Sequence, residues 1–286
     1  MPQLPFYFYP STMILSQLAS IPLSILLNLY RHRALILQMV KREVVGRYRG
    51  SFLGLLWSFV NPVLMLSIYT FVFSMVFKSR WGQGNEDNFE FALVLFAGLI
   101  VFNLFSECLS RAPSLILTNV NYVKKVIFPL EILPVVTLGS SLFHAGVNLA
   151  VLLIFLAATG HIPAWTSLLL PIVIAPLMLL ILGLSWLLAS IGVFVRDVGQ
   201  FVGMILTVLM FLSPIFYPIS ALPEEVQGYL FLNPLALPIE QARDVLIWGT
   251  TPDWGALGIY FGFTLVTAWA GLFWFEKTRK GFADVL

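Results

Sequence analysis

Charged residues are scarce in this chain of 286 residues, at 10% of the sequence against 59% hydrophobic residues. A soluble globular domain usually carries about a quarter charged residues. So few charges cannot cover a water-facing surface of this size, and the apolar residues must therefore face lipid. The composition excludes an ordinary soluble domain and predicts an all-α integral membrane protein, because helices satisfy their backbone hydrogen bonds internally.

Residues that bind metals or form disulfides are also rare. A single cysteine, Cys108, excludes an intrachain disulfide and a multi-cysteine metal site. It lies in an apolar stretch, and we expect it to be a packing residue. The three histidines, His32, His144 and His161, are far apart in the sequence, so no metal site is expected.

Motifs for nucleotide binding and hydrolysis are absent. The sequence contains no G-x-x-x-x-G-K-[ST] loop, no G-x-S-x-G elbow and no H-E-x-x-H pair. No cofactor is therefore expected in this chain, and energy for any driven transport has to enter through a partner. Acids and histidines are also nearly absent from the middle of the apolar segments, which argues against coupling to protons or sodium.

Long apolar segments dominate what the sequence does contain. There are six, each close to or above the roughly 20 residues that span a bilayer: Phe52–Phe77, Phe91–Ser110, Leu130–Ala158, Leu168–Val195, Phe201–Ile219 and Gly255–Phe275. The third and fourth exceed the minimum, so we expect them to be tilted or broken, for instance at Pro171 and Pro176. We predict one transmembrane domain over residues 51–286, preceded by a lead-in and an interface helix over residues 1–50.

The N-terminal stretch Met1–Tyr30 is apolar but is interrupted by prolines, and it lacks the basic leader and cleavage site of a secretory signal. We interpret it as a cytoplasmic or interfacial lead-in, with a short extra membrane segment at Met13–Leu29 as the alternative. In Arg31–Gly50 six basic residues interleave with apolar positions that recur every four residues. This pattern predicts an amphipathic helix in the membrane interface, or else an ordinary amphipathic packing helix.

Lysines and arginines are distributed unevenly between the connections, which predicts the orientation. With the N-terminus inside, the inner connections hold the six basic residues of 31–49, then Arg111, Lys124, Lys125, Arg196, Lys277, Arg279 and Lys280. The outer connections hold three, Lys78, Arg80 and Arg243, together with the acids Glu86, Asp87, Glu90, Glu224, Glu225, Glu240, Asp244 and Asp253. We therefore expect both termini to be cytoplasmic.

Two connections are long enough to have structure of their own. The outer stretch Ser220–Trp254 is divided by prolines into short helices, Glu224–Leu232 and Pro238–Trp248, which we expect to dip back toward the membrane. The inner loop Arg111–Pro129 has room for one short helix.

Ionisable residues within the segments are few, and each has a structural explanation. Glu107 precedes Arg111 by four residues, which predicts an ion pair on one helix. Glu131 follows Pro129 in the first turn of the third segment, where a carboxylate is favoured as a helix cap.

Aromatic residues make up 15% of the chain. Many are expected in interfacial belts. Tyr69 and Phe73 are one helical turn apart in the first segment, and Phe211, Phe216 and Tyr217 cluster in the fifth. Because aromatic faces suit the apolar faces of sugar rings, these five residues are candidate channel-lining residues for a neutral polymer.

Several stretches together resemble the permease subunits of polysaccharide ABC exporters, the type-2 exporters of O-antigen, teichoic acid and related lipid-linked glycans. They are GRYRGSFLGLLWSFVNPVLMLSIYTFVFSMVF (Gly46–Phe77), NVNYVKKVIFPLEILPV (Asn119–Val135), FVRDVGQ (Phe194–Gln200) and SPIFYPISALPEEVQGYLFLNPL (Ser213–Leu235). The resemblance runs in order from Arg31 to Phe282, and no single stretch is diagnostic alone. The lead-in before Tyr30 departs from the usual start of the family.

The resemblance implies a homodimer in the bacterial inner membrane, with two copies of a separate nucleotide-binding subunit that binds ATP and Mg. It implies an interface helix at Tyr30–Val45 and a coupling helix at Ala112–Tyr122 that docks on the ATPase, with Ala112, Ser114, Asn119, Asn121 and Tyr122 as the coupling residues. The outer helices of Ser220–Trp248 resemble the family's extracellular gate, and spans one and five would line a channel between the subunits.

The basic rim of this channel has two interpretations. Arg42, Arg47 and Arg49 are candidate contacts for the pyrophosphate of a lipid-linked polysaccharide, or they set the topology and bind the headgroups of membrane lipids. No nucleic acid partner is expected.

Three other functions stay open. One is a type-2 permease for a drug or other small molecule. Another is a membrane-embedded glycan-modifying enzyme, although the adjacent acids Glu224 and Glu225 have no partnering histidine. The third is a purely structural subunit.

Overall fold

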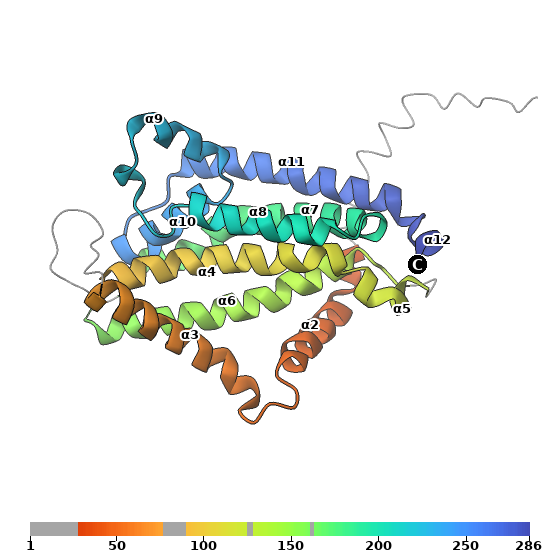
Figure 1. The fold of residues 1–286 in the computed structure, drawn as a ribbon, viewed down its shortest axis with the longest axis horizontal. Helices are drawn as coiled ribbons and strands as arrows, with labels where there is room; N and C mark the ends of the chain where they lie inside the picture. Colours follow the sequence, from red (N-terminus) through yellow and green to blue (C-terminus); the bar gives the residue numbers. More distant parts are fainter. Residues whose placement is uncertain (1–27, 77–89, 125–127, 161–162) are drawn as a thin grey trace, which may run out of the picture.

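The computed structural model describes residues 28–76, 90–124, 128–160 and 163–286. The N-terminal lead-in before residue 28 and the residues Lys78, Arg80, Glu86, Asp87, Lys125 and His161 lie outside these ranges. The described elements, all helical, are α2 (Arg33–Arg47), η1 (Gly54–Leu56), α3 (Trp57–Tyr69), η2 (Thr70–Val76), α4 (Glu90–Arg111), η3 (Ala112–Ser114), η4 (Leu117–Asn119), α5 (Val120–Val123), α6 (Ile132–Ala158), η5 (Trp165–Leu169), α7 (Leu170–Phe194), α8 (Val198–Leu212), η6 (Ile219–Ala221), α9 (Glu224–Gln227), η7 (Gly228–Leu232), α10 (Ala236–Arg243), η8 (Asp244–Trp248), α11 (Trp254–Arg279) and α12 (Phe282–Val285) (Figure 1).

Among the described residues, five helical stretches are long and apolar enough to cross a membrane, and α8 is a shorter apolar helix. The five are Gly54–Phe73, Glu90–Ser114, Ile132–Ala158, Trp165–Phe194 and Trp254–Arg279. The prediction of an all-α membrane protein with six apolar segments is therefore confirmed. The short helices predicted between the last two segments are also present, as α9 with η7 and as α10 with η8.

Three prolines bear on how the fourth and fifth segments compare with the prediction. The predicted break in the fourth segment is wrong: Pro171 occupies the first turn of α7, where no N–H is needed, and Pro176 lies inside one continuous helix. The fifth helix ends at Leu212 and not at Ile219, because Ser213 precedes Pro214 and takes an extended conformation, with ψ of 148°.

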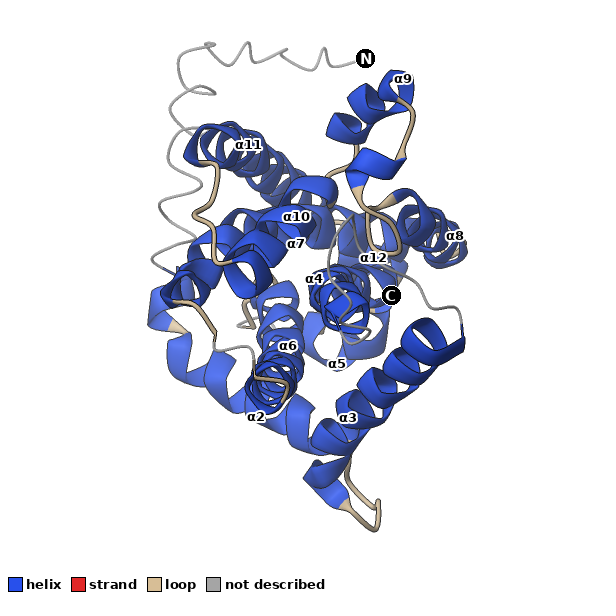
Figure 2. Cartoon of the chain, turned by 90° about the vertical axis from the view of Figure 1, so that its left-hand side faces the viewer, coloured by secondary structure: helices blue, strands red, loops and turns tan. Residues whose placement is uncertain are grey.

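Helix α4 is the centre of the fold. It packs against α3, α6, α7, α8 and α10, and Figure 2 shows it surrounded by them. In the span Glu90–Ser114, which contains α4, 83% of an 18-residue apolar stretch is buried inside the chain, against 11% of the corresponding stretch in Gly54–Phe73. A helix that is hydrophobic on all sides is suited to this central position. The buried thiol of Cys108, 1% exposed, lies on α4 and confirms the packing role predicted for it.

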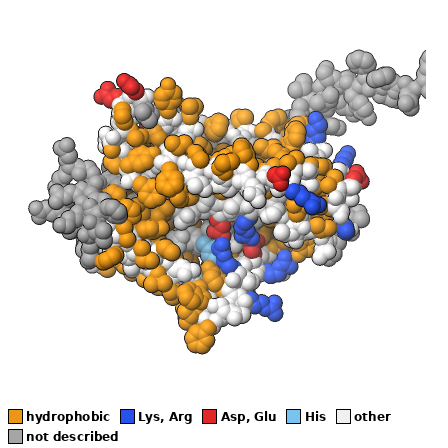
Figure 3. Space-filling view, in the orientation of Figure 1, with side chains coloured by type: hydrophobic (Ala, Val, Ile, Leu, Met, Phe, Trp, Pro, Cys, Tyr) orange, Lys and Arg blue, Asp and Glu red, His pale blue; other side chains and the backbone are white. Residues whose placement is uncertain are grey.

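The bundle has two different ends. We call the end that carries α5, α12 and the C-terminus the basic end, and Figure 3 shows Lys and Arg side chains gathered toward it. Helix α9, with the acids Glu224 and Glu225, lies toward the opposite end. Helix α2 packs its apolar side against α6, the contact that the packing alternative predicted.

Helices α7 and α11 pack with their backbones in contact. A Cβ atom added to Gly271 on α11 would collide with the carbonyl oxygen of Gly183 on α7. The two glycines therefore allow an approach that no larger residue permits, as is common where membrane helices associate.

This close approach predicts that Gly271→Ala destabilises the fold by about 1–3 kcal/mol, the usual range for overpacking. Thermal unfolding in detergent should show a lower midpoint than that of the wild type. The matched control is Gly262→Ala on the same helix, where a Cβ meets no atom within 4 Å. Equal midpoints for the two variants would contradict the role assigned to Gly271.

Candidate functional site

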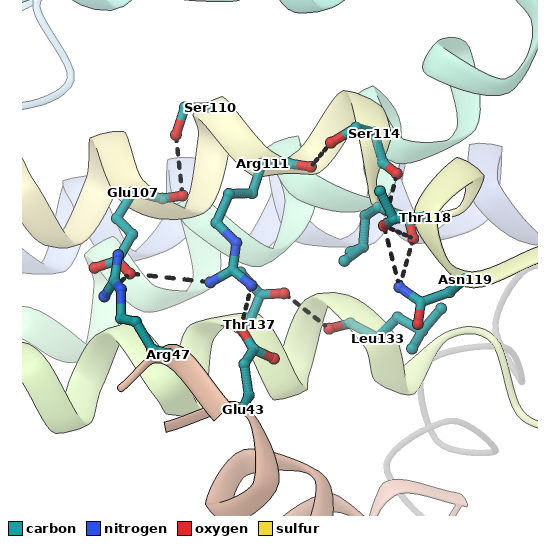
Figure 4. Close-up of polar contacts among 11 residues, drawn as sticks. Glu43, Arg47, Glu107, Ser110, Arg111, Ser114, Thr118, Asn119, Leu133 and Thr137 are labelled. Carbon is teal, nitrogen blue, oxygen red and sulfur yellow. Dashed lines mark hydrogen bonds and ion pairs between the residues drawn. The ribbon is translucent and has the colours of Figure 1, made fainter. Parts of the chain in front are cut away.

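A polar cavity of about 420 Å³ opens at the basic end of the bundle. Five elements form it: α2, the last turn of α4, the turns η3 and η4, and the first turns of α6 (Figure 4). Its lining comprises Met39, Arg42, Glu43, Arg111, Ser114, Leu115, Thr118, Asn119, Leu133, Val136 and Thr137. The cavity therefore lies between the predicted interface helix and the predicted coupling segment.

Four charged side chains link α2 to α4 beside this cavity. Arg47 Nη1 lies 2.7 Å from Glu107 Oε1, and Arg111 pairs with Glu43. The predicted pair of Glu107 and Arg111 is confirmed, although its 3.9 Å separation makes it weaker than the two contacts that cross between helices. We call these four residues the ion network. Figure 3 shows basic and acidic side chains together in a hollow on this face.

The hydroxyl and amide groups of the cavity are turned toward the backbone as donors. Ser114 Oγ donates to the carbonyl of Arg111 at 3.1 Å, and Thr118 Oγ1 donates to that of Ser114 at 3.0 Å. Asn119 Nδ2 donates to the carbonyl of Leu115 at 2.9 Å. Thr118 Oγ1 also accepts a hydrogen bond from Asn119 Nδ2 at 3.3 Å; the remaining lone pairs of these oxygens can accept further hydrogen bonds, while Arg42 and Arg111 supply donors.

The predicted coupling residues lie together but not on one helix. The segment is a series of short turns, since Pro113 lies in the first turn of η3 and Asn119 leaves helical geometry at φ −119° before α5. Ala112 is buried, Ser114 and Asn121 are exposed, and Asn119 is half-buried.

Tyr122 ties this segment to α2. Its hydroxyl accepts a hydrogen bond from Arg42 Nη2 at 2.9 Å, and its ring stacks on Phe128 with centroids 4.3 Å apart. Among the described residues, the three arginines predicted to bind pyrophosphate therefore diverge: Arg42 contacts Tyr122, Arg47 contacts Glu107, and Arg49 is exposed.

Sequence reasoning missed Glu43 and Tyr48. Glu43 is the one acid in 31–50, and its position four residues before Arg47 on a basic helix was an available signal. Tyr48 places its hydroxyl 3.5 Å from Nδ1 of His144, and burial raises the pKa of this phenol. Its proton therefore stays in place at neutral pH.

Glu131 is the N-cap residue of α6, at the helix start where it was predicted, but its side chain does not cap the helix. Its side chain makes no capping hydrogen bond, and Oε2 pairs instead with Arg279 Nη1 at 2.9 Å. Because Arg279 ends α11, this contact ties the basic ends of α6 and α11 together. The carbonyl of Glu131 also accepts a hydrogen bond from Trp186 Nε1 at 3.0 Å.

The candidate channel residues form two separate sets. Tyr69 and Phe73 belong to α3 and η2 and pack against this chain's own core, with the Phe73 ring 5.3 Å from that of Phe91. Phe211, at the end of α8, stacks on Phe216 with centroids 6.0 Å apart, and Phe211 is 61% exposed. Tyr217 donates its hydroxyl to the carbonyl of Phe211 at 3.2 Å.

A buried arginine at the opposite end was also missed. Arg243 is 1% exposed and donates to backbone carbonyls of α4 and of the segment after α8. Glu240 Oε1 lies 2.7 Å from its Nη1. The spacing of these two residues on α10 was the available signal, but charge distribution alone assigned both to an outer loop.

Comparison with known proteins supplies a family match over most of the chain. The family model described as ABC-2 type transporter matches residues 34–247. The chain is 32% identical to an O-antigen export system permease protein RfbA of Myxococcus xanthus, covering 90% of this chain and 97% of that protein. It is 25% identical to an RfbA of Klebsiella pneumoniae, covering 88% and 95%, and 26% identical to the polysialic acid transport protein KpsM of Escherichia coli, covering 81% and 88%.

The ion network predicts that Arg111→Gln destabilises the protein by about 1 kcal/mol, the upper end for partly exposed pairs, because Glu43 loses its partner. The matched control is Lys41→Gln, which removes the same charge from an exposed position on α2. Thermal unfolding of both variants tests this. Adding Glu43→Gln to Arg111→Gln should cost less than Glu43→Gln alone, and full additivity would contradict the pairing.

Proposed function

Because the chain belongs to the ABC-2 type transporter family, we propose that it is the membrane subunit of an ATP-driven exporter of lipid-linked polysaccharide, such as an O-antigen. The observation that carries this proposal is its similarity, over nearly its whole length, to permeases named for O-antigen and polysialic acid export. The chain contributes the path through the membrane and not the chemistry of hydrolysis.

ATP and Mg are bound by two copies of a separate nucleotide-binding subunit. The absence of any phosphate-binding loop from the sequence supports this division of labour. We place the docking of this partner at η3, η4 and α5, where Ser114 and Asn121 are exposed. A displacement of this segment would reach α2 through Tyr122 and through Arg111, so the partner could move the interface helix and α4 together.

We place the channel at the seam of a homodimer, on the face flanked by α3 and α8 (Figure 2). Both helices leave large apolar side chains exposed. These are Leu55, Leu56, Phe59, Leu64, Met65, Ile68 and Phe71 on the first span, and Phe201, Met204, Ile205, Val208, Phe211 and Leu212 on α8. A seam that opens by rigid-body tilting suits a long polymer better than a pocket of fixed size.

The basic end would face the cytoplasm, with both termini on that side. The excess of Lys and Arg in the connections at this end supports the orientation. Arg42, Arg47 and Arg49 then lie at the side from which a lipid-pyrophosphate enters. Arg47 is 46% exposed at its side chain, which leaves part of its guanidinium available to such a group while Glu107 holds the rest.

Deleting the gene is the direct test of the substrate class. Lipid-linked glycan should accumulate on the cytoplasmic side and disappear from the cell surface, and this chain should restore export only together with its ATPase subunit. Glycan would be extracted separately from the two locations. An unchanged surface polymer without internal accumulation would favour the alternative, an exporter of a drug or other small molecule.

The proposed docking segment predicts a cross-link. Cys108 is the one cysteine of the sequence and is 1% exposed. In a Cys108→Ser background, an introduced cysteine is therefore the one thiol in the chain. Asn121→Cys carrying a thiol-reactive photo-cross-linker should cross-link to the ATPase subunit. Tyr229→Cys, 71% exposed on η7 toward the opposite end, is the control. Cross-linking of similar yield from both positions would contradict the proposed docking.

A further inference from the structure

Helix α8 is too short to cross a bilayer. It has 15 residues, about 22 Å at 1.5 Å per residue, against a hydrocarbon thickness of roughly 30 Å. The exposed charges of Arg196 and Asp197 directly before it keep its first turn near one membrane surface. Its last residue, Leu212, therefore lies about 8 Å short of the other surface by the same arithmetic. The irregular segment 213–218 thus begins at membrane depth.

Irregular backbone at this depth needs partners for its carbonyl groups, because lipid supplies none. Side chains provide them here. The hydroxyl of Tyr217 donates to the carbonyls of Phe211 and Leu212, at 3.2 and 3.1 Å. Arg243 takes the next two available carbonyls: Nη1 donates to Pro214 at 2.5 Å and Nη2 to Ile215 at 2.9 Å. The segment is a closed turn held by side chains.

The guanidinium of Arg243 is fixed against α4 as well. Its Nε donates to the carbonyl of Val94 at 3.1 Å, and a Cβ atom added to Gly98 would lie 2.8 Å from its Nη2. Gly98 therefore provides the space that lets the guanidinium reach the α4 backbone. One buried side chain thus joins α4 and α10 to the turn after α8.

Two aromatic rings lie beside this break, that of Phe211 near the end of α8 and that of Phe216 within the turn. Phe211 and Phe216 stack on each other; Phe211 is 61% exposed, and Phe216 is half-buried and packs against the core. A broken helix at membrane depth is a common position for a substrate site in transporters. Stacked rings in a fixed orientation offer a flat apolar surface at little entropic cost.

We propose that Arg243 is a positioning residue: by binding the carbonyls of Pro214 and Ile215 it fixes the turn so that Phe211 and Phe216 form a contact surface for the glycan within the membrane. This inference rests on the proposed function. It assigns to Arg243 an effect on how the glycan is bound, beyond any effect on folding.

The test uses the complete exporter, this chain with its ATPase subunit, in proteoliposomes containing lipid-linked glycan at a series of concentrations. In Gly98→Ala the added methyl group displaces the guanidinium while Arg243 itself is retained. We expect the apparent KM for glycan to rise about tenfold, which corresponds to the loss of roughly 1.4 kcal/mol of contact between the displaced rings and the glycan, with a smaller change in maximal rate. The matched control, Gly146→Ala in α6, has open space around its Cβ and should keep the wild-type KM.

A double-mutant comparison separates positioning from general destabilisation. Replacing both rings, Phe211→Ala with Phe216→Ala, should raise KM, and adding Gly98→Ala to that variant should raise it no further. An additive increase, or an unchanged KM in an assembled Gly98→Ala exporter, would overturn the inference.

Glu240→Gln covers the case in which Gly98→Ala does not assemble. It removes the charge beside Nη1 and keeps the side-chain shape, so KM should rise by a smaller factor, and no rise would overturn the inference. A wild-type exporter that moves no glycan would contradict both the proposed function and the proposed glycan contact surface of Phe211 and Phe216. A working wild type with an unaffected Gly98→Ala variant would sink the role of Arg243 alone.

Discussion

Backbone groups inside a membrane have to find their hydrogen-bond partners within the protein, and the rest of this structure depends on that requirement. Five of the apolar stretches meet it as long helices, which pair their own carbonyl and amide groups. Helix α8 does not run far enough, and its last carbonyls are met by the hydroxyl of Tyr217 and, after the break at Pro214, by the guanidinium of Arg243. Beyond the last hydrogen bonds within the helix, the side chains of Arg243 and Tyr217 donate to the backbone carbonyls instead.

The same constraint explains which parts of the fold could be predicted from the sequence. Segments of about 20 apolar residues form helices in lipid, so the number and approximate positions of the helices followed from where the long apolar stretches lie in the sequence. The ends of the segments did not. Apolar residues continue through Pro214 to Ile219, so hydropathy extended the fifth segment, whereas the backbone preference of Ser213 before a proline ended it. Pro176 had the opposite outcome, since a membrane helix tolerates a proline that its neighbours compensate.

In the candidate site, contacts between residues close in the sequence could be predicted, and contacts between distant residues could not. Glu107 and Arg111 are four residues apart on one helix, and their pairing was readable from spacing. The contacts of Arg47 with Glu107, and of Glu131 with Arg279, join residues that are far apart in the sequence, by 148 positions in the second case, and spacing cannot reveal them. Arg243 is the extreme case. Its sequence position predicted a short outer helix, Pro238–Trp248, that dips toward the membrane, but not the burial of its side chain. Three of its partners are backbone carbonyls, which carry no sequence signal.

Helix α4 connects the two ends of the bundle. Its 22 residues make a rod of about 33 Å, with Glu107 and Arg111 at one end and the carbonyl of Val94 near the other. Because α4 is packed against five other helices and contacts α2 at one end and Arg243 near the other, a rigid-body displacement of α4 would move the ion network and the turn after α8 together.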